Sequence, residues 1–276
     1  MKHSEFNWKT EDGIDMFGQS WNPDIPSCAT IVLVHGLGEH SSRYQHVAEY
    51  FTGHGFNFIT SDHRGHGRST GKRGHAGSYE DFCQEIDHLT DLSKRNNPDK
   101  PIFLYGHSLG GAIVLYHALK HHPAISGIIA TSPGLAPARN PRLVYEAGKL
   151  MATLIPGLIL KNGLDLTGIS RDPQIIENYK KDRLNHADIS AKLGVDLISN
   201  GLWIREHASE FPLPLLLLQG SADRVINLSA TREFAQKMPS SATYCEWAGG
   251  YHELHNEPDK VKVFTVMLGW METMLN

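Results

Sequence analysis

A serine flanked by glycines is the first candidate for chemistry in this chain. Gly106-His107-Ser108-Leu109-Gly110 matches the pattern Gly-x-Ser-x-Gly, with the apolar run IFLY (102–105) before it and a helical pattern after it. A strand that turns directly into a helix strains its central residue and leaves no room for side chains two positions away, which explains both glycines. The turn also places the hydroxyl at a helix N-terminus, where negative charge is stabilised. We predict that Ser108 is a nucleophile; a glycine-rich turn with a capping serine is the simpler alternative.

A serine hydroxyl needs a base within hydrogen-bonding distance. The chain has 17 histidines, so position along the sequence must select among them. Where this serine motif occurs, an acid and then a histidine follow it along the chain. Asp223 follows the apolar run LPLLLLQ (213–219), and His252 follows TYCEW (243–247). We predict that Asp223 orients His252 as the base; a surface-turn role for Asp223 and His255 as a rival base are the alternatives.

Acyl transfer also requires two backbone N–H donors for the oxygen of the tetrahedral intermediate. One donor is expected from Leu109, the residue after the nucleophile. The other is expected from the turn HGLGEH (35–40), where Gly36 and Gly38 let the backbone approach closely. We predict that Leu37 supplies this second N–H group, with a plain strand-to-helix turn as the alternative.

These residues need a scaffold that brings them together. Short apolar runs rich in β-branched residues alternate with helical patterns along most of the chain. The predicted strands are 30–34, 56–61, 102–105, 126–130, 213–219 and 243–247, and the predicted helices are 43–52, 79–97, 109–121, 229–237 and 259–274. This alternation predicts an α/β fold, with a mostly parallel central sheet and helices on both faces.

The alternation breaks after residue 132. Residues 133–209 are mostly helical in pattern and rich in proline, and a connection of this length is far longer than an ordinary loop. We therefore expect a core made of residues 1–132 and 210–276, with residues 133–209 inserted as a mainly helical cap segment over the site.

The first half of the cap segment is strongly apolar. Its apolar residues are Leu143, Val144, Leu150, Met151, Leu154, Ile155, Leu158, Ile159 and Leu160. They have two interpretations: ordinary packing of the cap segment onto the core, or the lining of an acyl tunnel with transient contact at a membrane surface.

Composition excludes several classes of protein. Of the 276 residues, 40% are apolar and 20% are charged, as in globular proteins, and the net charge is −4. No basic face is indicated, which argues against a nucleic-acid partner. The polar N-terminus predicts no signal peptide, and no apolar run reaches the roughly 18 residues of a membrane span. We expect a cytoplasmic protein, peripheral at membranes where the cap segment touches them, and a monomer or homodimer.

Metal and cofactor sites are not expected. Cys28, Cys83 and Cys245 are odd in number and lack metal-like spacing, which indicates idle thiols in a reducing compartment. The glycine-rich loop 61–75 carries three histidines without acidic or cysteine ligands at metal spacing, which argues against zinc. These histidines are His63, His66 and His75.

Five motifs together resemble the monoacylglycerol lipase family of α/β-hydrolases, which includes bacterial lysophospholipase-like hydrolases. They are HGLGEHSSRY (35–44), SDHRGHGRSTGKRGH (61–75), GHSLGG (106–111), SRDPQIIENYKKDRLNH (170–186) and LLLQGSADRVI (216–226). The resemblance extends from about Phe17 to the C-terminal helix. The serine motif alone indicates only an α/β-hydrolase, whereas the first two motifs together are far more specific.

The resemblance implies a cofactor-free carboxylester hydrolase that acts on single-chain lipids. It assigns the triad to Ser108, Asp223 and His252, and the oxyanion N–H groups to Leu37 and Leu109. It places four further residues at the polar end of the pocket: Glu39, Arg43, His107 and Tyr179. His186 stands where the human lipase has a cysteine near the site, so the thiol sensitivity of that enzyme is not expected here.

The expected reaction is cleavage of a monoacylglycerol to fatty acid and glycerol through an acyl-enzyme. Lysophospholipase and thioesterase activities are the nearer alternatives, and an aminopeptidase or a non-catalytic binding protein are the more distant ones. Hydrolases of this fold that use an aspartate nucleophile are excluded by Ser108.

Overall fold

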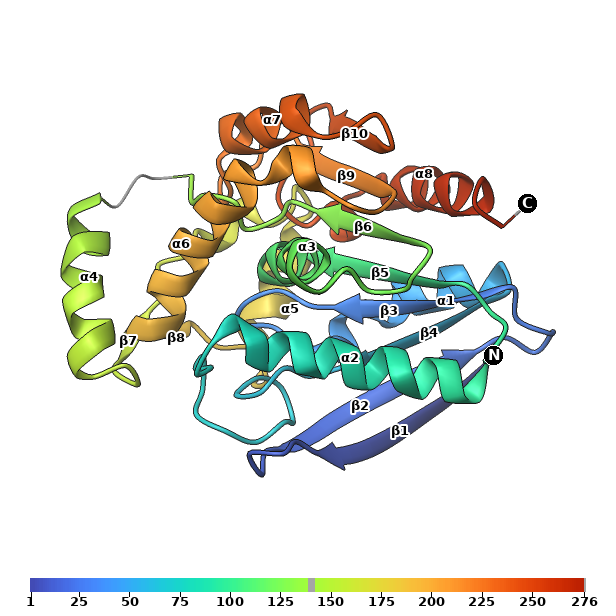
Figure 1. Cartoon of the computed structure of the whole chain (residues 1–276), viewed down its shortest axis with the longest axis horizontal. Coiled ribbons are helices and arrows are strands. Elements are labelled where there is room, and N and C mark those ends of the chain that lie inside the picture. Colours follow the sequence, from blue (N-terminus) through green and yellow to red (C-terminus); the bar gives the residue numbers. More distant parts are fainter. Residues whose placement is uncertain (139–141, 276) are drawn as a thin grey trace.

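An eight-stranded sheet forms the centre of the molecule (Figure 1). The structure is a computed structural model, which describes the backbone of residues 1–138 and 142–275 and the side chains of residues 1–138 and 145–275. The strand order is β1-β2-β4-β3-β5-β6-β9-β10, and all neighbours from β4 to β10 are parallel. The strands are β1 (Lys2–Lys9), β2 (Asp15–Asn22), β3 (Ala29–Val34), β4 (Phe56–Ser61), β5 (Ile102–His107), β6 (Gly127–Thr131), β9 (Leu215–Gly220) and β10 (Ala242–Trp247). The predicted α/β fold with a mostly parallel sheet is confirmed.

The sheet is covered by helices on both faces because its central strands are apolar on both faces. Val32 and Val34 belong to one buried cluster, and their neighbours Ile31 and Leu33 belong to the other. Helices α2 (Tyr79–Asn96), α3 (Leu109–His121) and α7 (Leu228–Lys237) contribute to the first cluster, and α1 (Gln45–Gly53) and α8 (Lys260–Glu272) contribute to the second. Alternate residues of a strand point to opposite faces, so one apolar run such as ATIVLV supplies both cores.

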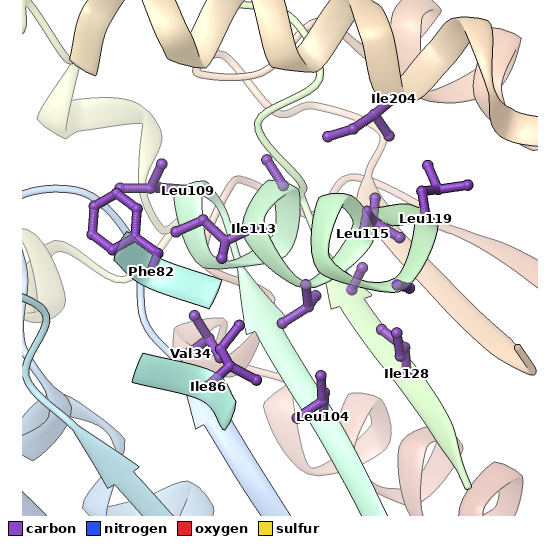
Figure 2. Packing of buried hydrophobic residues seen from close by; sticks show 14 of the residues in the cluster. Val34, Phe82, Ile86, Leu104, Leu109, Ile113, Leu115, Leu119, Ile128 and Ile204 are labelled. Atoms are coloured by element: carbon purple, nitrogen blue, oxygen red, sulfur yellow. The ribbon is translucent and has the colours of Figure 1, made fainter. Parts of the chain in front are cut away.

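Most of helix α3 is buried by apolar contacts on two opposite sides (Figure 2). Val34, Leu104 and Ile128 rise from the sheet toward it, while Ile204 of α6 (Ala191–Glu206) approaches it from the opposite side. Leu109 and Ile113 themselves are fully buried. Truncating one such side chain costs about 2–5 kcal/mol, so the N-terminus of α3 has little freedom to move.

The cap segment, residues 133–209, leaves the sheet after β6 and returns just before β9. It contains α4 (Arg142–Leu154), β7 (Ile159–Lys161), η2 (Leu166–Gly168), α5 (Pro173–Lys181), β8 (Asp188–Ser190) and α6, where η marks a 3₁₀ helix. A further 3₁₀ helix, η3 (Ala208–Glu210), ends just past the segment. Strands β7 and β8 pair only with each other, outside the main sheet. The segment is mainly helical as expected, and its role as a separate cap remains a prediction.

The apolar residues of the cap segment divide into two groups. Leu150, Leu154 and Ile155 are 63%, 69% and 59% exposed, and Met151 and Leu160 are also exposed. Leu158 and Ile159 are half-buried. Leu143 and Val144 lie outside the described side chains. Packing against the core therefore does not explain the apolar side chains at the end of α4. Figure 1 shows this helix at the edge of the molecule beyond α6.

Two features of the fold differ from the sequence prediction. The antiparallel hairpin of β1 and β2 was not expected, because β1 (KHSEFNWK) has no continuous apolar face and is largely exposed. The predicted helix 43–52 is a 3₁₀ turn, η1 (Ser41–Tyr44), followed by α1. Among the described residues, no helix is long and apolar enough to cross a membrane.

Candidate active site

Ser108 lies in a sharp turn between β5 and α3. Its backbone has φ +54° and ψ −115°, a conformation that costs a non-glycine residue free energy. A Cβ atom at Gly106 would lie 2.4 Å from the carbonyl oxygen of Gly110, and one at Gly110 would lie 2.0 Å from that of Val34. The two glycines of the motif are therefore sterically required, and the turn presents the Ser108 hydroxyl at the start of α3.

Ser108, His252 and Asp223 form a continuous chain of hydrogen bonds. The Ser108 Oγ and His252 Nε2 atoms are 2.9 Å apart, as are His252 Nδ1 and Asp223 Oδ2. Asp223 follows β9 and His252 follows β10, so the carboxyl ends of neighbouring parallel strands bring both to Ser108. The structure thus places His252, rather than the rival His255, against the serine hydroxyl.

The acidic member of this chain is held as a carboxylate. The backbone N–H groups of Val225 and Ile226 donate to Asp223 Oδ1 at 2.8 and 3.0 Å, and Gln219 Nε2 donates to Oδ2 at 3.0 Å. Burial raises the pKa of Asp223, but the contacts to His252 and to these two N–H groups outweigh burial and lower it. Asp223 is therefore a charged acceptor and not a surface turn residue.

The pKa of His252, the basic member, is shifted upward, in the opposite direction to that of Asp223. Burial lowers the pKa of His252, yet the charge and hydrogen bond of Asp223 outweigh burial and raise this pKa above its ordinary value of 6.5. The raised pKa makes the neutral imidazole a better acceptor for the Ser108 proton, which it can later return.

Leu37 and Leu109 lie beside Ser108. Leu109 is the first residue of α3, and both leucines line the same cavity as Ser108. The turn that carries Leu37 is stabilised by the Gly36 N–H group, which donates to Glu39 Oε1 at 2.7 Å. Gly38 adopts φ +75°, a conformation that favours glycine.

An apolar cavity of about 270 Å³ extends from Ser108 into the cap segment. Its wall is largely aliphatic and comes from the turn after β6, the β7–β8 pair and α6. The lining includes Leu37, Leu109, Pro137, Leu160, Ile189, Val195, Leu197 and Ile198. The cavity can bury an extended apolar chain whose polar end reaches Ser108.

A second, small cavity of about 20 Å³ also borders Ser108; we call it the polar cavity because several polar side chains reach it, although most of its surface is apolar. Glu39, His107 and Tyr179 line it, as does Glu253. Burial, with the nearby His252 as a lesser cause, lowers the pKa of His107 to about 3, so this imidazole is neutral at neutral pH. Its Nδ1 atom lies 3.1 Å from Thr131 Oγ1.

Arg43, the remaining predicted pocket residue, lies behind this wall. Its guanidinium donates to both carboxylate oxygens of Glu253, at 2.9 and 2.7 Å, and also to Glu39. It lies 4.7 Å from the ring centroid of Tyr179. Arg43 therefore holds the acidic residues of the wall in place. Sequence reasoning does not find Glu253, because the low exposure of Arg43, which calls for such a partner, is visible only in the fold.

Tyr179 and His186 link the cap segment to the turn after β3. The Tyr179 hydroxyl donates to the Gly38 carbonyl oxygen at 3.0 Å, and the His186 N–H group donates to the same oxygen at 2.9 Å. A Cβ atom at Gly38 would lie 2.3 Å from the His186 carbonyl oxygen, so this glycine permits the close approach.

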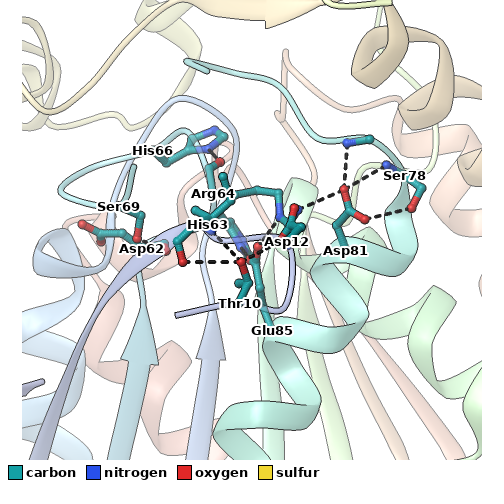
Figure 3. Close-up of polar contacts among 12 residues, drawn as sticks. Thr10, Asp12, Asp62, His63, Arg64, His66, Ser69, Ser78, Asp81 and Glu85 are labelled. Atoms are coloured by element: carbon teal, nitrogen blue, oxygen red, sulfur yellow. Dashed lines mark hydrogen bonds and ion pairs between the residues drawn. The ribbon is translucent and has the colours of Figure 1, made fainter. Parts of the chain in front are cut away.

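The histidines of the loop after β4 serve structural contacts. His63 Nδ1 lies 3.0 Å from Glu85 Oε2, and the same carboxylate accepts from Arg64 Nε at 2.7 Å (Figure 3). His66 Nδ1 lies 3.0 Å from the Arg64 carbonyl oxygen, and His75 Nδ1 lies 2.9 Å from Ser190 Oγ. Each of the three imidazoles thus has a different partner, which does not favour a shared zinc site.

Comparison with known proteins identifies the family of the chain. The family model described as serine aminopeptidase, S33 matches residues 25–259. The chain is 32% identical to the monoacylglycerol lipase of Mycolicibacterium smegmatis, covering 99% of this chain and 98% of that protein. It is 35% identical to an uncharacterized abhydrolase domain-containing protein of Dictyostelium discoideum, of whose length it spans 29%.

A solved structure is similar over the whole chain. The crystal structure of Paleococcus ferrophilus monoacylglycerol lipase has a TM-score of 0.85 and 32% sequence identity, covering 99% of this chain and 100% of that one. The chain therefore belongs to the serine aminopeptidase S33 family of α/β-hydrolases and, within it, to the monoacylglycerol lipase-like carboxylic ester hydrolases.

Proposed function

We propose that this protein hydrolyses the ester bond of single-chain lipids, with monoacylglycerol as the principal substrate, through an acyl-enzyme on Ser108. The observation that carries the proposal is that Ser108 borders both a large apolar cavity and a small one that Glu39, His107 and Tyr179 help to line. A substrate with one long apolar chain and one small polar alcohol fits this division.

The reaction has two halves. His252 takes the proton of the Ser108 hydroxyl, whose oxygen attacks the ester carbonyl, and the N–H groups of Leu37 and Leu109 stabilise the oxygen of the tetrahedral intermediate. His252 then protonates the leaving glycerol oxygen, and the acyl group remains on Ser108. A water molecule, deprotonated by His252, releases the fatty acid and restores the hydroxyl.

Binding is divided between the two cavities. The acyl chain occupies the apolar cavity, where each buried methylene contributes about 0.8 kcal/mol. A hydroxyl group of the glycerol end reaches Glu39, His107 and Tyr179 at the polar cavity, with Arg43 as the positioning residue behind them. The apolar cavity beside Ser108 accommodates one acyl chain, so we expect triacylglycerols to be poor substrates. The exposed end of α4 brings the protein to the membrane surface from which the lipid enters.

The family description also names an aminopeptidase, and the site argues against that reaction. An aminopeptidase needs a carboxylate for the free amine of its substrate. Apart from Asp223, which is bound to His252, the buried carboxylates beside the site are Glu39 and Glu253, and Arg43 already binds both. Glu39 also accepts from the Tyr44 hydroxyl at 2.7 Å, and Glu253 from Asn256 Nδ2 at 2.7 Å.

The test is a panel of kcat/KM values over monoacylglycerols of increasing chain length, triacylglycerols, lysophospholipids, acyl thioesters and aminoacyl amides. We expect monoacylglycerols to be the best substrates, with kcat/KM rising with chain length until the cavity is full. If lysophospholipids or thioesters were the best substrates, glycerol would be the wrong leaving group. Equal rates on tri- and monoacylglycerols, or no gain from acetyl to octanoyl esters, would refute the proposal.

A further inference from the structure

Helices α2 and α3 bring together three side chains of the kind that bind metal ions, far from Ser108. Glu80 and Cys83 lie on α2, and His121 is the last residue of α3. One ligand atom from each, a carboxylate oxygen, the Sγ atom and an imidazole nitrogen, lies within 4.8 Å of the other two. Because α3 rises 1.5 Å per residue, this cluster is about 20 Å from Ser108.

The spacing of these residues is suited to one shared ion. Glu80 and Cys83 are three residues apart and occupy one face of α2, which packs against α3. His121 Nε2 lies 2.8 Å from Glu80 Oε2, so these two atoms already face each other. A zinc ion with bonds of about 2.0–2.3 Å separates its ligand atoms by more than three ångströms, so small rotations of the side chains suffice.

The carboxylate is oriented by a neighbour that leaves one oxygen available. The Tyr116 hydroxyl donates to Glu80 Oε1 at 3.0 Å, while Oε2 faces His121. Hydrogen bonds of this kind are typical behind metal ligands, because they fix the ligand without using the binding atom. One turn earlier on α3, His117 is fully buried; its Nε2 lies 2.8 Å from Asp87 Oδ1, and its Nδ1 has no hydrogen-bond partner among the described residues.

The electrostatic environment favours a cation. The carboxylates of Glu80 and Asp87 lie near the Cys83 thiol, and their negative charge attracts a divalent ion. The partners of the two carboxylates are imidazoles, His121 and His117, rather than lysine or arginine. A metal ion can displace these contacts without leaving an ammonium or guanidinium group unpaired.

Access to the cluster is from one side. Cys83 is buried, whereas the side chains of Glu80 and His121 are 46% and 39% exposed. The thiol therefore forms the inner wall of the site, and the carboxylate and imidazole form its outer rim. Three protein ligands leave the fourth position of a tetrahedral ion open to water.

We propose that Glu80, Cys83 and His121 form a binding site for a borderline divalent cation of the Zn²⁺ class, which links α2 to α3. A mixed sulfur, nitrogen and oxygen donor set selects such ions over Mg²⁺ or Ca²⁺. On binding, the Cys83 thiol releases one proton to solvent as the sulfur–metal bond forms. The site is independent of the hydrolytic reaction, and it is invisible to sequence spacing because its ligands come from two helices.

The test uses Co²⁺ alone as the probe. Thiolate coordination to Co²⁺ produces a near-ultraviolet charge-transfer absorption band, which histidine sites without a thiolate ligand do not give. We expect one equivalent of Co²⁺ to produce this band in the wild-type protein, and Zn²⁺ to abolish it by displacement. Cys83→Ser and His121→Ala should lose the band, and Glu80→Gln should weaken binding at least tenfold. Cys28→Ser and Cys245→Ser are the matched controls and should keep it.

A thermal measurement gives a second result. At one hundred times its dissociation constant, Zn²⁺ should raise the Tm of the wild-type protein by about 5 °C, and of His121→Ala by much less. Circular dichroism identifies a variant that fails to fold. If Cys83→Ser fails to fold, His121→Ala provides the test instead, because His121 lies at an exposed helix end. Absence of the band in the wild-type protein, its persistence in folded Cys83→Ser or His121→Ala, or its loss in Cys245→Ser would overturn the proposal.

Discussion

The Tyr179 hydroxyl donates a hydrogen bond to the carbonyl oxygen of Gly38 at 3.0 Å. Tyr179 belongs to α5 of the cap segment, and Gly38 lies in the turn next to Leu37. The same contact thus fixes one wall of the polar cavity and the backbone that we assign to the oxyanion hole. This hydrogen bond therefore connects the cap segment to the turn that carries Leu37.

Tyr179→Phe removes this donor and leaves the ring in place. A lost buried hydrogen bond costs about 1 kcal/mol of stability, and a displaced oxyanion donor lowers kcat/KM by about tenfold. Steady-state kinetics on a monoacylglycerol and a thermal melt measure the two effects. Tyr50→Phe is the matched control, because its hydroxyl contacts Thr265 at an exposed site; an equal loss in both variants would contradict the link.

The choice of base predicts a contrast between two histidines three residues apart. His252→Ala should reduce kcat by about 10⁶-fold, as removal of a catalytic base does elsewhere, because Ser108 then lacks its proton acceptor. His255→Ala should be far milder, since this ring packs on Tyr44 and His107 instead. A reversed order of the two losses would show that His255 is the base.

The pH dependence of kcat/KM follows from the pKa of His252. Only the neutral imidazole can accept the Ser108 proton, and Asp223 raises the pKa of His252 above 6.5 by stabilising the protonated form. Activity should therefore fall as pH drops through this raised pKa, whereas His107, with a pKa of about 3, does not titrate there. Asp223→Asn should shift the acid limb to lower pH and reduce kcat by about 10⁴-fold. An unchanged acid limb would be incompatible with this assignment.

The Arg43–Glu253 pair predicts a stability difference between buried and exposed ion pairs. Glu253→Gln weakens a bidentate contact at side chains that are 10% and 4% exposed, and should cost about 2–3 kcal/mol in urea unfolding. Glu246→Gln weakens the similar bidentate contact to Arg232 at an exposed site and should cost less than about 1 kcal/mol. Equal costs would show that burial of the Arg43 pair is not what makes it strong.

Local patterns and long-range contacts differ in how far the sequence predicts them. The strand–turn–helix around Ser108 is encoded within a few residues, because the glycine positions follow from local sterics. Asp223 and His252 were selected by the chain order that accompanies this serine motif. The hairpin of β1 and β2 was missed because the alternating face of β1 carries only two apolar residues, Phe6 and Trp8. Glu253 was missed because only the fold reveals that Arg43, 210 residues away, needs it.

The central claim is that Ser108 carries the acyl group, and the adduct itself tests this most directly. The protein is mixed with the p-nitrophenyl ester of octanoic acid, quenched with acid during the first turnovers, digested and analysed by mass spectrometry. The account predicts one octanoyl group on the peptide that contains Ser108, a burst of nitrophenol, and neither in Ser108→Ala, which should keep its fold and lose about 10⁶-fold in kcat. An octanoyl group on another residue, or a Ser108→Ala variant with more than about a tenth of the wild-type kcat, would contradict it.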